Sequence, residues 1–311
     1  MDATSVELFE AGRNRLASLA YRLLGSAADA EDVVQDAFLR WQAADRGHIE
    51  VPEAWLTKVV TNLALDRLRS ARARRERAVG AWVPEPLLDG DPMLGPADTA
   101  QQRESVTLAV LMLLERLSPV QRAVYVLREA FSYGHGEIAQ ILDITESASQ
   151  QHAHRARRRV AAERDTAEVD RALARRVVEA FVEAASSGRT ERLVALLTDD
   201  AVAITDGAGL AGKLLRYSSP ERVAAVIRAG FTPTPAKRRL AGGSPSIHAG
   251  VVNGSPAMIA ALADRVVGVV LLDVRGDRIA AVRGIASQER LGRLSEQWRR
   301  GDHGDPLIAS W

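Results

Sequence analysis

Residues 137–160, EIAQILDITESASQQHAHRARRRV, contain two apolar patterns of helical spacing with a break between them. The first pattern gives a short helix one apolar side, made of Ile138, Ala139, Ile141 and Leu142. Residues 143–146, DITE, interrupt this spacing, and a second helix is expected to begin near Ser147. The stretch therefore predicts a helix, a tight turn and a second helix.

The second of these helices has one apolar and one polar side. Its apolar side consists of Ala148, Ala153, Ala156 and Val160. Its polar side consists of Ser147, Gln150, Gln151, His154 and Arg158. Gln and Arg side chains can hydrogen-bond to base edges in the major groove of duplex DNA, and Arg also contacts phosphates. The pattern favours a DNA-recognition helix, and the alternative interpretation is a solvated face of a helical bundle.

The composition of the 311-residue chain is that of an ordinary globular protein, and its length suffices for two or three domains. The formal net charge is only +1, so a nucleic-acid site depends on local clusters of cations. Arginines do cluster, with six of them within residues 67–77 and four within residues 155–159.

The chain contains no cysteine, which excludes disulfides and thiolate zinc sites. Residues 1–16 carry acidic side chains where a signal peptide needs a basic region followed by an apolar run. No segment has the apolar length of a membrane span. We therefore expect a cytoplasmic protein with no membrane partner, no cofactor and no bound metal.

Two helices are expected before residue 44. The first covers residues 5–24 and ends at Gly25, and Ser26 with Asp29 resembles a capping box for the second, at about residues 28–43. The second helix has a buried stripe consisting of Ala30, Val33, Val34, Ala37, Phe38 and Trp41. Its exposed flanks carry Glu31, Asp32, Gln35 and Asp36, an acidic surface that is either solvated or contacts a partner.

A third, longer helix is expected to begin near Pro52, with an apolar side made of Leu56, Val59, Val60, Leu63 and Leu68. Its outer face carries Lys58, Asn62, Asp66 and Arg69, ahead of the first arginine cluster. Polar groups beside a cationic track are typical of a site for a nucleic-acid strand. The alternative for Asp66 is a local ion pair with Arg67 or Arg69.

Residues 79–104 are rich in Pro, Gly and Asp, which predicts a linker between domains. Within it, residues 82–86, WVPEP, combine an indole with two prolines, and this favours docking on a surface over simple packing. Two more helices are expected within residues 104–131, the second of them opened by Ser118 and Pro119.

The sequence after about residue 168 predicts an α+β domain. Helices are expected near residues 177–185, 193–197 and 219–231. Five short apolar runs predict strands at residues 201–205, 245–252, 256–264, 266–274 and 278–287. This order favours helices packed on one face of a curved antiparallel sheet. The tail from about residue 300 is expected to be loosely held, with Trp311 as a docking residue.

Residues 12–75 resemble region two of bacterial extracytoplasmic-function sigma factors, in the segments AYRLLGSAADAEDVVQDAFLRW and AWLTKVVTNLALDRLRS. Residues 106–160 resemble region four of that family, in LERLSPVQRAVYVLREAFSYGHGEIAQILDITESASQQHAHRARR. WVPEP is similar to the WLPEP-like linker of a subgroup with a fused SnoaL-like domain. The resemblance implies two all-α domains, region two at 1–78 and helix-turn-helix region four at 105–165, joined by a linker at 79–104. An α+β SnoaL-like cone at 168–298 and a tail at 299–311 would follow.

Members of this family bind RNA polymerase core, read two promoter elements and catalyse no reaction. The resemblance assigns contact with the core to Asp29, Glu31, Asp32, Gln35, Asp36 and Phe38. It assigns the downstream promoter element to Asn62, Asp66, Arg69 and Arg72, with the loop at 44–51. It assigns the upstream element to Ser147, Gln150, Gln151, His154, Arg155 and Arg158. His152 and Arg155 are expected to pack or to contact phosphate.

Two places in the fused domain depart from the subgroup. A DGGGK-like motif is replaced by residues 206–209, DGAG, with Gly212 and Lys213 later, and an NPDKL-like motif by residues 287–291, SQERL. The expected interdomain regulatory contact involves Trp82, Pro84, Glu85 and Pro86 of the linker and Asp206, Gly207 and Gly209 of the turn.

Regulation in cis is the preferred interpretation of the C-terminal domain. The alternatives are a small-ligand pocket and catalysis by Asp206, His248 and Asp273, although their spacing marks no catalytic dyad. A further alternative for the whole chain is a duplex-DNA-binding regulator with a ligand-sensing or enzymatic effector domain. The second nucleic-acid module at residues 16–70 argues against this alternative. The sequence specifies neither the promoter bases nor an anti-sigma partner.

Overall fold

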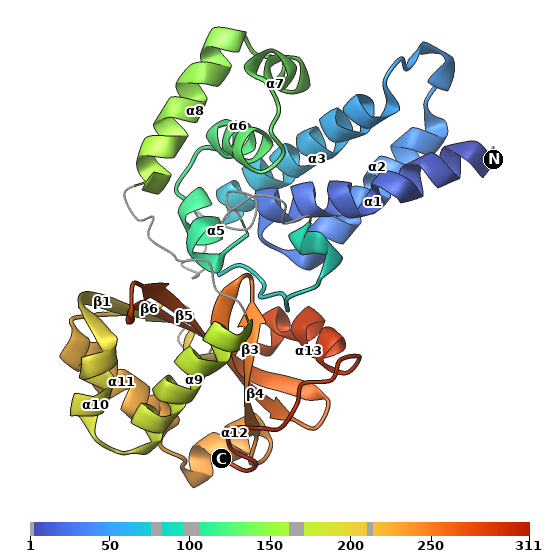
Figure 1. Cartoon of the computed structure of the whole chain (residues 1–311). Coiled ribbons are helices and arrows are strands. Elements are labelled where there is room, and N and C mark those ends of the chain that lie inside the picture. The colour runs from blue at the N-terminus through green and yellow to red at the C-terminus, as the bar shows by residue number, and fades with distance from the viewer. Residues whose placement is uncertain (1–2, 76–82, 96–105, 162–170, 210–213) are drawn as a thin grey trace. The chain divides into compact units, whose positions relative to one another are not determined.

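The computed structural model describes residues 3–75, 83–95, 106–161, 171–209 and 214–311 (Figure 1). The chain forms two compact units. The helical unit comprises Met1–Ala78 and Gly90–Arg164, and the C-terminal unit comprises Val79–Asp89 and Asp165–Trp311. Residues 83–89 therefore pack with the C-terminal unit, although they lie between two helical segments in sequence.

In its described residues, the helical unit consists of α-helices and two short 3-10 helices. Its elements are α1 (Ala3–Leu24), α2 (Ala27–Ala43), η1 (Arg46–His48), α3 (Pro52–Arg75), η2 (Pro92–Leu94), α5 (Leu108–Leu114), α6 (Pro119–Glu129), α7 (His135–Leu142) and α8 (Glu146–Ala161). The predicted helix starts are confirmed by their caps, since Ser26 accepts a hydrogen bond from Asp29 N and Ser118 forms a capping box with Gln121. Among the described helices, none is long and apolar enough to cross a lipid bilayer.

The apolar core of α1–α3 follows the predicted spacing with two shifts. Phe38 is half-buried, and its ring packs against that of Phe9 with centroids 4.8 Å apart. Along α3, Val59 and Leu63 are half-buried, whereas Ala64 and Leu65 are fully buried. The buried side of α3 is therefore rotated from the predicted one, because α3 packs against α1, α2, α6 and α7.

Two arginines lie inside the helical unit, and their terminal nitrogens donate hydrogen bonds within it. Arg22 Nη1 donates to the Ser18 hydroxyl, and Arg22 Nη2 donates to Leu94 O at 2.8 Å. Arg122 Nη1 pairs with Glu115, and Arg122 Nη2 donates to Arg22 O at 3.4 Å. Burial lowers the pKa of Arg22 to about 10. These contacts join α1 to the η2 segment and to α6.

The C-terminal unit is a six-stranded sheet covered by helices. Its strands are β1 (Leu197–Thr205), β2 (Leu215–Ser218), β3 (Ser246–Val252), β4 (Ser255–Leu262), β5 (Arg265–Arg275) and β6 (Arg278–Ile285), in the order β2-β1-β6-β5-β4-β3. The sheet is mixed, since β1 runs parallel to β6. The prediction of an antiparallel sheet was wrong at this pair, because β1, which pairs antiparallel with β2 on one side, pairs with the last strand, β6, on its other side.

Helices pack on both faces of this sheet. The helical elements are α9 (Arg171–Ser186), α10 (Thr190–Leu196), η3 (Gly207–Gly209), α11 (Pro220–Phe231), α12 (Pro235–Ala241), η4 (Gln288–Arg290) and α13 (Gly292–Trp298). α9 packs against β3 and β4, and α11 packs against β1 (Figure 1). α13 packs against β5, and the ring of its Trp298 packs against the ring of His248 in β3. Ile247 and Ala249, the neighbours of His248 along β3, point to the other face of the sheet and pack in the same core as residues of α9. β2 and α12 were not predicted.

The C-terminal tail is held at its end. Leu307 N donates to Ile247 O at 2.7 Å, and Ile247 N donates to Ile308 O at 2.8 Å. Trp311 Nε1 donates to Phe231 O at 2.6 Å. The expected docking of Trp311 is confirmed, whereas the expectation of a loose tail was wrong from residue 307 onward because its backbone bonds to the edge strand β3.

The described part of the linker lies against the edge of β3. Leu87 N donates to Asn253 Oδ1 at 2.8 Å, and Asn253 N donates to Leu87 O at 2.9 Å. Leu88 N donates to Gln297 Oε1 at 3.0 Å, and Arg290 Nη1 donates to Val83 O. Trp82 lies outside the described residues, and so do Gly212 and Lys213. These bonds go to the β3–β4 turn, α13 and η4, and none of them involves the turn at 206–209.

Asn253 gives a test of how firmly the linker docks. The residue is buried, has φ 49°, and closes two hydrogen bonds with Leu87. We expect Asn253→Gly to speed backbone hydrogen exchange of residues 83–89 by about tenfold, because one buried N–H loses its acceptor. Asn253→Ala should speed it further, because alanine disfavours a positive φ. Exchange measured by mass spectrometry that is unchanged in both variants would contradict the docking.

Candidate nucleic-acid and partner interfaces

The predicted helix-turn-helix is confirmed in α7 and α8 (Figure 1). Asp143 between them has φ 52° and ψ 48°, the left-handed conformation that turns the chain after α7. The buried side of α8 contains Ala153, Ala156 and Val160 as predicted. Ser149 is also buried and hydrogen-bonds to His135 Nδ1 at 2.9 Å, whereas Ala148 is only half-buried. A hydroxyl with a partner on α7 therefore occupies a core position that the apolar pattern missed.

The outer side of α8 is polar and exposed. We call it the recognition face, and it consists of Ser147, Gln150, Gln151, His154, Arg155 and Arg158, all of them exposed. His152 is half-buried, and burial followed by the charge of Arg155 lowers its pKa. A half-buried imidazole agrees with the expectation that His152 packs. The recognition face thus offers amide, imidazole and guanidinium donors on one solvent-facing surface.

Two of the four arginines in the second cluster point back into the helical unit. Arg157 pairs with Glu129 of α6 at 2.7 Å, and Glu129 is buried. Arg159 donates to Gln121 Oε1 of α6 at 3.1 Å. The cluster therefore divides, with Arg157 and Arg159 anchoring α8 to α6 and Arg155 and Arg158 facing solvent.

The outer face of α3 carries a second group of candidate residues. Asp66 and Arg69 are exposed and form an ion pair at 3.1 Å, which is the local pairing expected as the alternative. Asn62 is half-buried. Arg72 belongs to α3, and its side chain lies outside the described ones. The pair between Asp66 and Arg69 is solvated on both sides, so water or another polar partner can replace either member at little cost.

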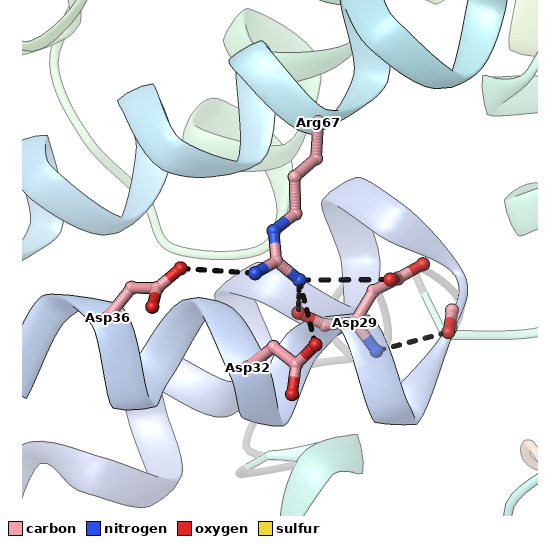
Figure 2. Close-up of polar contacts among 5 residues, drawn as sticks. Asp29, Asp32, Asp36 and Arg67 are labelled. Atoms are coloured by element: carbon pink, nitrogen blue, oxygen red, sulfur yellow. Dashed lines mark hydrogen bonds and ion pairs between the residues drawn. The ribbon is translucent and has the colours of Figure 1, made fainter. Parts of the chain in front are cut away.

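An arginine of α3 lies over the acidic flank of α2 (Figure 2). Arg67 Nη2 is 3.1 Å from Asp36 Oδ2, and Arg67 Nη1 is 3.3 Å from Asp32 Oδ2 and 3.7 Å from Asp29 Oδ1. Arg67 Nη1 also donates to Asp29 O at 3.1 Å. Glu31 and Gln35 are exposed, and Phe38 packs inward on Phe9. Arg67, counted in the first arginine cluster, is therefore directed to α2.

The helix-turn-helix also contacts α1 and α3 through polar side chains. Tyr133 Oη accepts from Arg15 Nη2 at 2.7 Å and lies 3.1 Å from Thr57 Oγ1. Lys58 Nζ pairs with Asp143 Oδ1 at 2.7 Å and donates to Gln140 O at 3.0 Å. Lys58 lies outward on α3 as expected, and its partner is the turn of the helix-turn-helix. Sequence spacing carries no signal for such a pairing between residues more than eighty positions apart.

The three candidate acid–base groups of the C-terminal unit are each engaged separately. Asp206 accepts from Ala208 N at 2.9 Å, Ala286 N at 3.0 Å and Ser287 N at 2.9 Å. Asp273 pairs with Arg283. His248 Nε2 is 3.0 Å from Ser246 Oγ, and burial followed by the charge of His303 lowers its pKa. Within the described ranges, no three His, Asp or Glu side chains gather as a metal site.

Comparison with known proteins gives matches along the chain. Residues 8–74 match the family described as Sigma-70 region 2, and residues 107–160 match Sigma-70, region 4. The ECF RNA polymerase sigma factor SigJ of Mycobacterium tuberculosis is 41% identical over 212 residues, which are 68% of each chain. The probable ECF RNA polymerase sigma factor SigI of that species is 33% identical over 291 residues, 92% of this chain and 94% of the relative.

The fold agrees with a solved structure of the same kind. The crystal structure of Mycobacterium tuberculosis extracytoplasmic function sigma factor SigJ superposes with a TM-score of 0.69 and 30% identity, covering 93% of this chain and 98% of that one. The two helical segments and the C-terminal helix and sheet unit are matched together. The C-terminal unit is consistent with the expected SnoaL-like cone.

The network around Arg67 allows a matched stability test. Arg67 is about one-third exposed and faces three carboxylates, whereas Arg69 is 59% exposed and faces one. We expect Arg67→Gln to lower the free energy of unfolding by about 1 kcal/mol, and Arg69→Gln by a few tenths at most. Urea unfolding of the full chain, followed by helical circular dichroism, measures both. Equal losses in the two variants would mean that the network adds nothing to a single surface pair.

Proposed function

The chain belongs to the ECF RNA polymerase sigma factors, which direct transcription initiation, and from this premise we propose which of its surfaces perform each step. The recognition face of α8 reads the upstream promoter element as duplex DNA. The outer face of α3 holds the downstream element, α2 meets RNA polymerase core, and the C-terminal unit regulates output in cis. The observation that carries the proposal is the polar, exposed recognition face on a helix whose opposite side is buried.

Reading of the upstream element is supported by the different contacts that the side chains of α8 make. Arg157 and Arg159 fix the helix to α6, so the recognition face is presented on a rigid element. Gln150, Gln151 and His154 carry donors and acceptors suited to base edges, and Arg155 and Arg158 suit edges or phosphates. Rigid presentation reduces the entropy lost when these side chains bind a groove.

The downstream element is assigned to Asn62, Asp66, Arg69 and Arg72. The exposed pair between Asp66 and Arg69 keeps a carboxylate and a guanidinium at the surface at little cost. A carboxylate can accept from an exocyclic base amine, and a guanidinium can follow the strand's phosphates. The pair can therefore be exchanged for contacts with an unpaired strand without loss of fold stability.

Contact with the core polymerase is assigned to the acidic flank of α2. Asp29, Asp32 and Asp36 contribute three negative charges and Arg67 one positive charge, which leaves a net charge of −2 on this cluster before Glu31 is counted. An acidic surface of this kind steers and orients a basic partner. Arg67 holds the three carboxylates in fixed positions, which favours one docking geometry.

Regulation in cis is supported by the docking of residues 83–89 on the C-terminal unit. A tethered contact works at high effective concentration, so even a weak docking interaction is populated. The relatives carry the names of sigma factors, and Asp206, His248 and Asp273 are each engaged in structural bonds. We therefore favour a regulatory C-terminal unit over a catalytic one.

Promoter reading is tested by single substitutions on α8. We expect Gln150→Ala and His154→Ala each to cost about 1–3 kcal/mol of promoter binding and to relax preference at one upstream position. Arg158→Ala should weaken binding to all sequences alike if its guanidinium contacts phosphate. The measurement is binding of the polymerase holoenzyme to a series of single-base promoter variants. Glu146→Ala, at the start of α8, serves as the control, and uniform weakening by all three substitutions would contradict base reading.

Regulation in cis is tested at the linker. We expect Arg290→Gln to free the linker backbone at Val83 and to change transcript yield from one fixed promoter about twofold or more, without changing promoter choice. Truncation after residue 168 should change yield in the same direction. Arg275→Gln, which removes a surface pair with Asp200, is the matched control. The measurement is transcription in vitro at several core concentrations, and equal yields from all four proteins would refute cis-regulation.

A further inference from the structure

The C-terminal unit contains a cavity of about 570 Å³ between the sheet and its helices. Its walls are formed by α11, α12 and strands β1, β4, β5 and β6, and by the C-terminal residue Trp311. Most of the lining is aliphatic or aromatic, including Phe231, Met258 and Val270. A cavity of this size and character is in the range that binds small organic molecules.

The charged side chains in the described lining of the cavity are all cationic. Within the described part of the chain, the lining includes Lys237 and Arg265 and no acidic residue. Lys237 Nζ is held by backbone carbonyls at the end of α11, those of Ala229, Gly230 and Thr232. The N–H groups of Lys237 therefore donate to backbone carbonyls of the cavity wall.

Arg265 is the cation that can receive a ligand. It is exposed while lining the cavity, so it stands where the apolar walls meet solvent. Nη1 donates to Gln288 Oε1 at 3.1 Å, and Nη2 donates to Ala241 O at 3.0 Å. These bonds use two of the five N–H groups of a guanidinium and hold its plane in position. A guanidinium fixed in this way matches a carboxylate.

The acid–base groups of this unit do not reach the cavity. Asp206, His248 and Asp273 are absent from its lining, and each has structural partners of its own. Thr205 is the hydroxyl residue of the lining, and its Oγ1 accepts from Gly207 N at 3.2 Å. These three groups therefore take no part in the cavity, whose described lining has the chemistry of a binding site.

We propose that this cavity binds an amphipathic organic anion, with an apolar body inside the cone and a carboxylate head on Arg265. The apolar walls supply the affinity through burial of hydrocarbon. The two cations of the lining, Lys237 and Arg265, favour a negatively charged head group. This site goes beyond the assignment of the chain as a sigma factor.

The site borders the segment that holds the linker. Ala286 and Gln288 line the cavity, and Arg290 in the same η4 turn donates to Val83 O. Asp206 fixes this turn through the amides of Ala286 and Ser287. An occupant therefore contacts the same short segment that holds the linker, which gives it a direct route to the regulatory contact.

The test is direct binding to the full chain, with dodecanoate as the probe and dodecylammonium as the charge-reversed control. Calorimetric titration should show one saturable site for dodecanoate, with a Kd about tenfold or more below that of dodecylammonium. Arg265→Gln should raise the Kd for dodecanoate about tenfold, whereas Arg275→Gln, outside the cavity, should leave it unchanged. The measurement contains no polymerase, so its failure is distinct from failure of the promoter assignments.

A second test of the proposal fills the cavity with a larger side chain. Ala260 lines it from β4, and Ala260→Phe should abolish binding while the chain keeps its circular dichroism spectrum. If that variant does not fold, a diazirine-bearing dodecanoate should label the unchanged chain at residues that line the cavity. Absence of saturable binding, equal affinity for the two probes, tight binding by folded Ala260→Phe, or labelling confined to other residues would each overturn the proposal.

Discussion

The arrangement of the helical unit depends on two arginines in its interior. A buried guanidinium is tolerated only when its N–H groups find acceptors, and each unsatisfied donor costs about 1–3 kcal/mol. Arg22 finds Leu94 O and the Ser18 hydroxyl, and Arg122 finds Glu115 and Arg22 O. Gly95 has φ 72°, and a Cβ there would lie 2.4 Å from Ser18 Oγ, so only glycine permits this close approach. These bonds fix α6, the helix that carries α8, to α1.

The contacts made by the turn of the helix-turn-helix are of a different kind. The pair between Lys58 and Asp143 is largely solvated, with exposed fractions of 40% and 73%, and pairs of this kind contribute about 0–1 kcal/mol. Beside it, the half-buried Arg15 and Tyr133 hydrogen-bond with each other and with the buried Thr57. Rearranging α7 and α8 relative to α3 therefore costs little in polar contacts. Separating α6 from α1 would instead leave buried hydrogen-bond donors without acceptors. The position of α6 relative to α1 therefore depends on the buried arginines more than on these surface contacts.

The local features of this fold were predictable because they are encoded within one turn of helix or one strand. Ser26, Ser118 and Pro119 predicted helix starts, and the apolar spacing of Ala153, Ala156 and Val160 predicted the buried side of α8. Features that depend on partners far along the chain were missed. The periodicity of α3 does not show that Arg67 lies over α2 or that Lys58 meets Asp143, and hairpin spacing does not predict that β1 runs parallel to β6.

The described part of the linker belongs to the C-terminal unit up to Asp89 and to the helical unit from Gly90 onward. Residues 83–89 are bonded to the C-terminal unit, and Leu94 is held by Arg22 in the helical unit. Gly90 stands between them with φ 90°, a conformation that side chains disfavour. The cis-regulation proposed above would therefore act through the backbone between Val83, held by Arg290, and Leu94, held by Arg22.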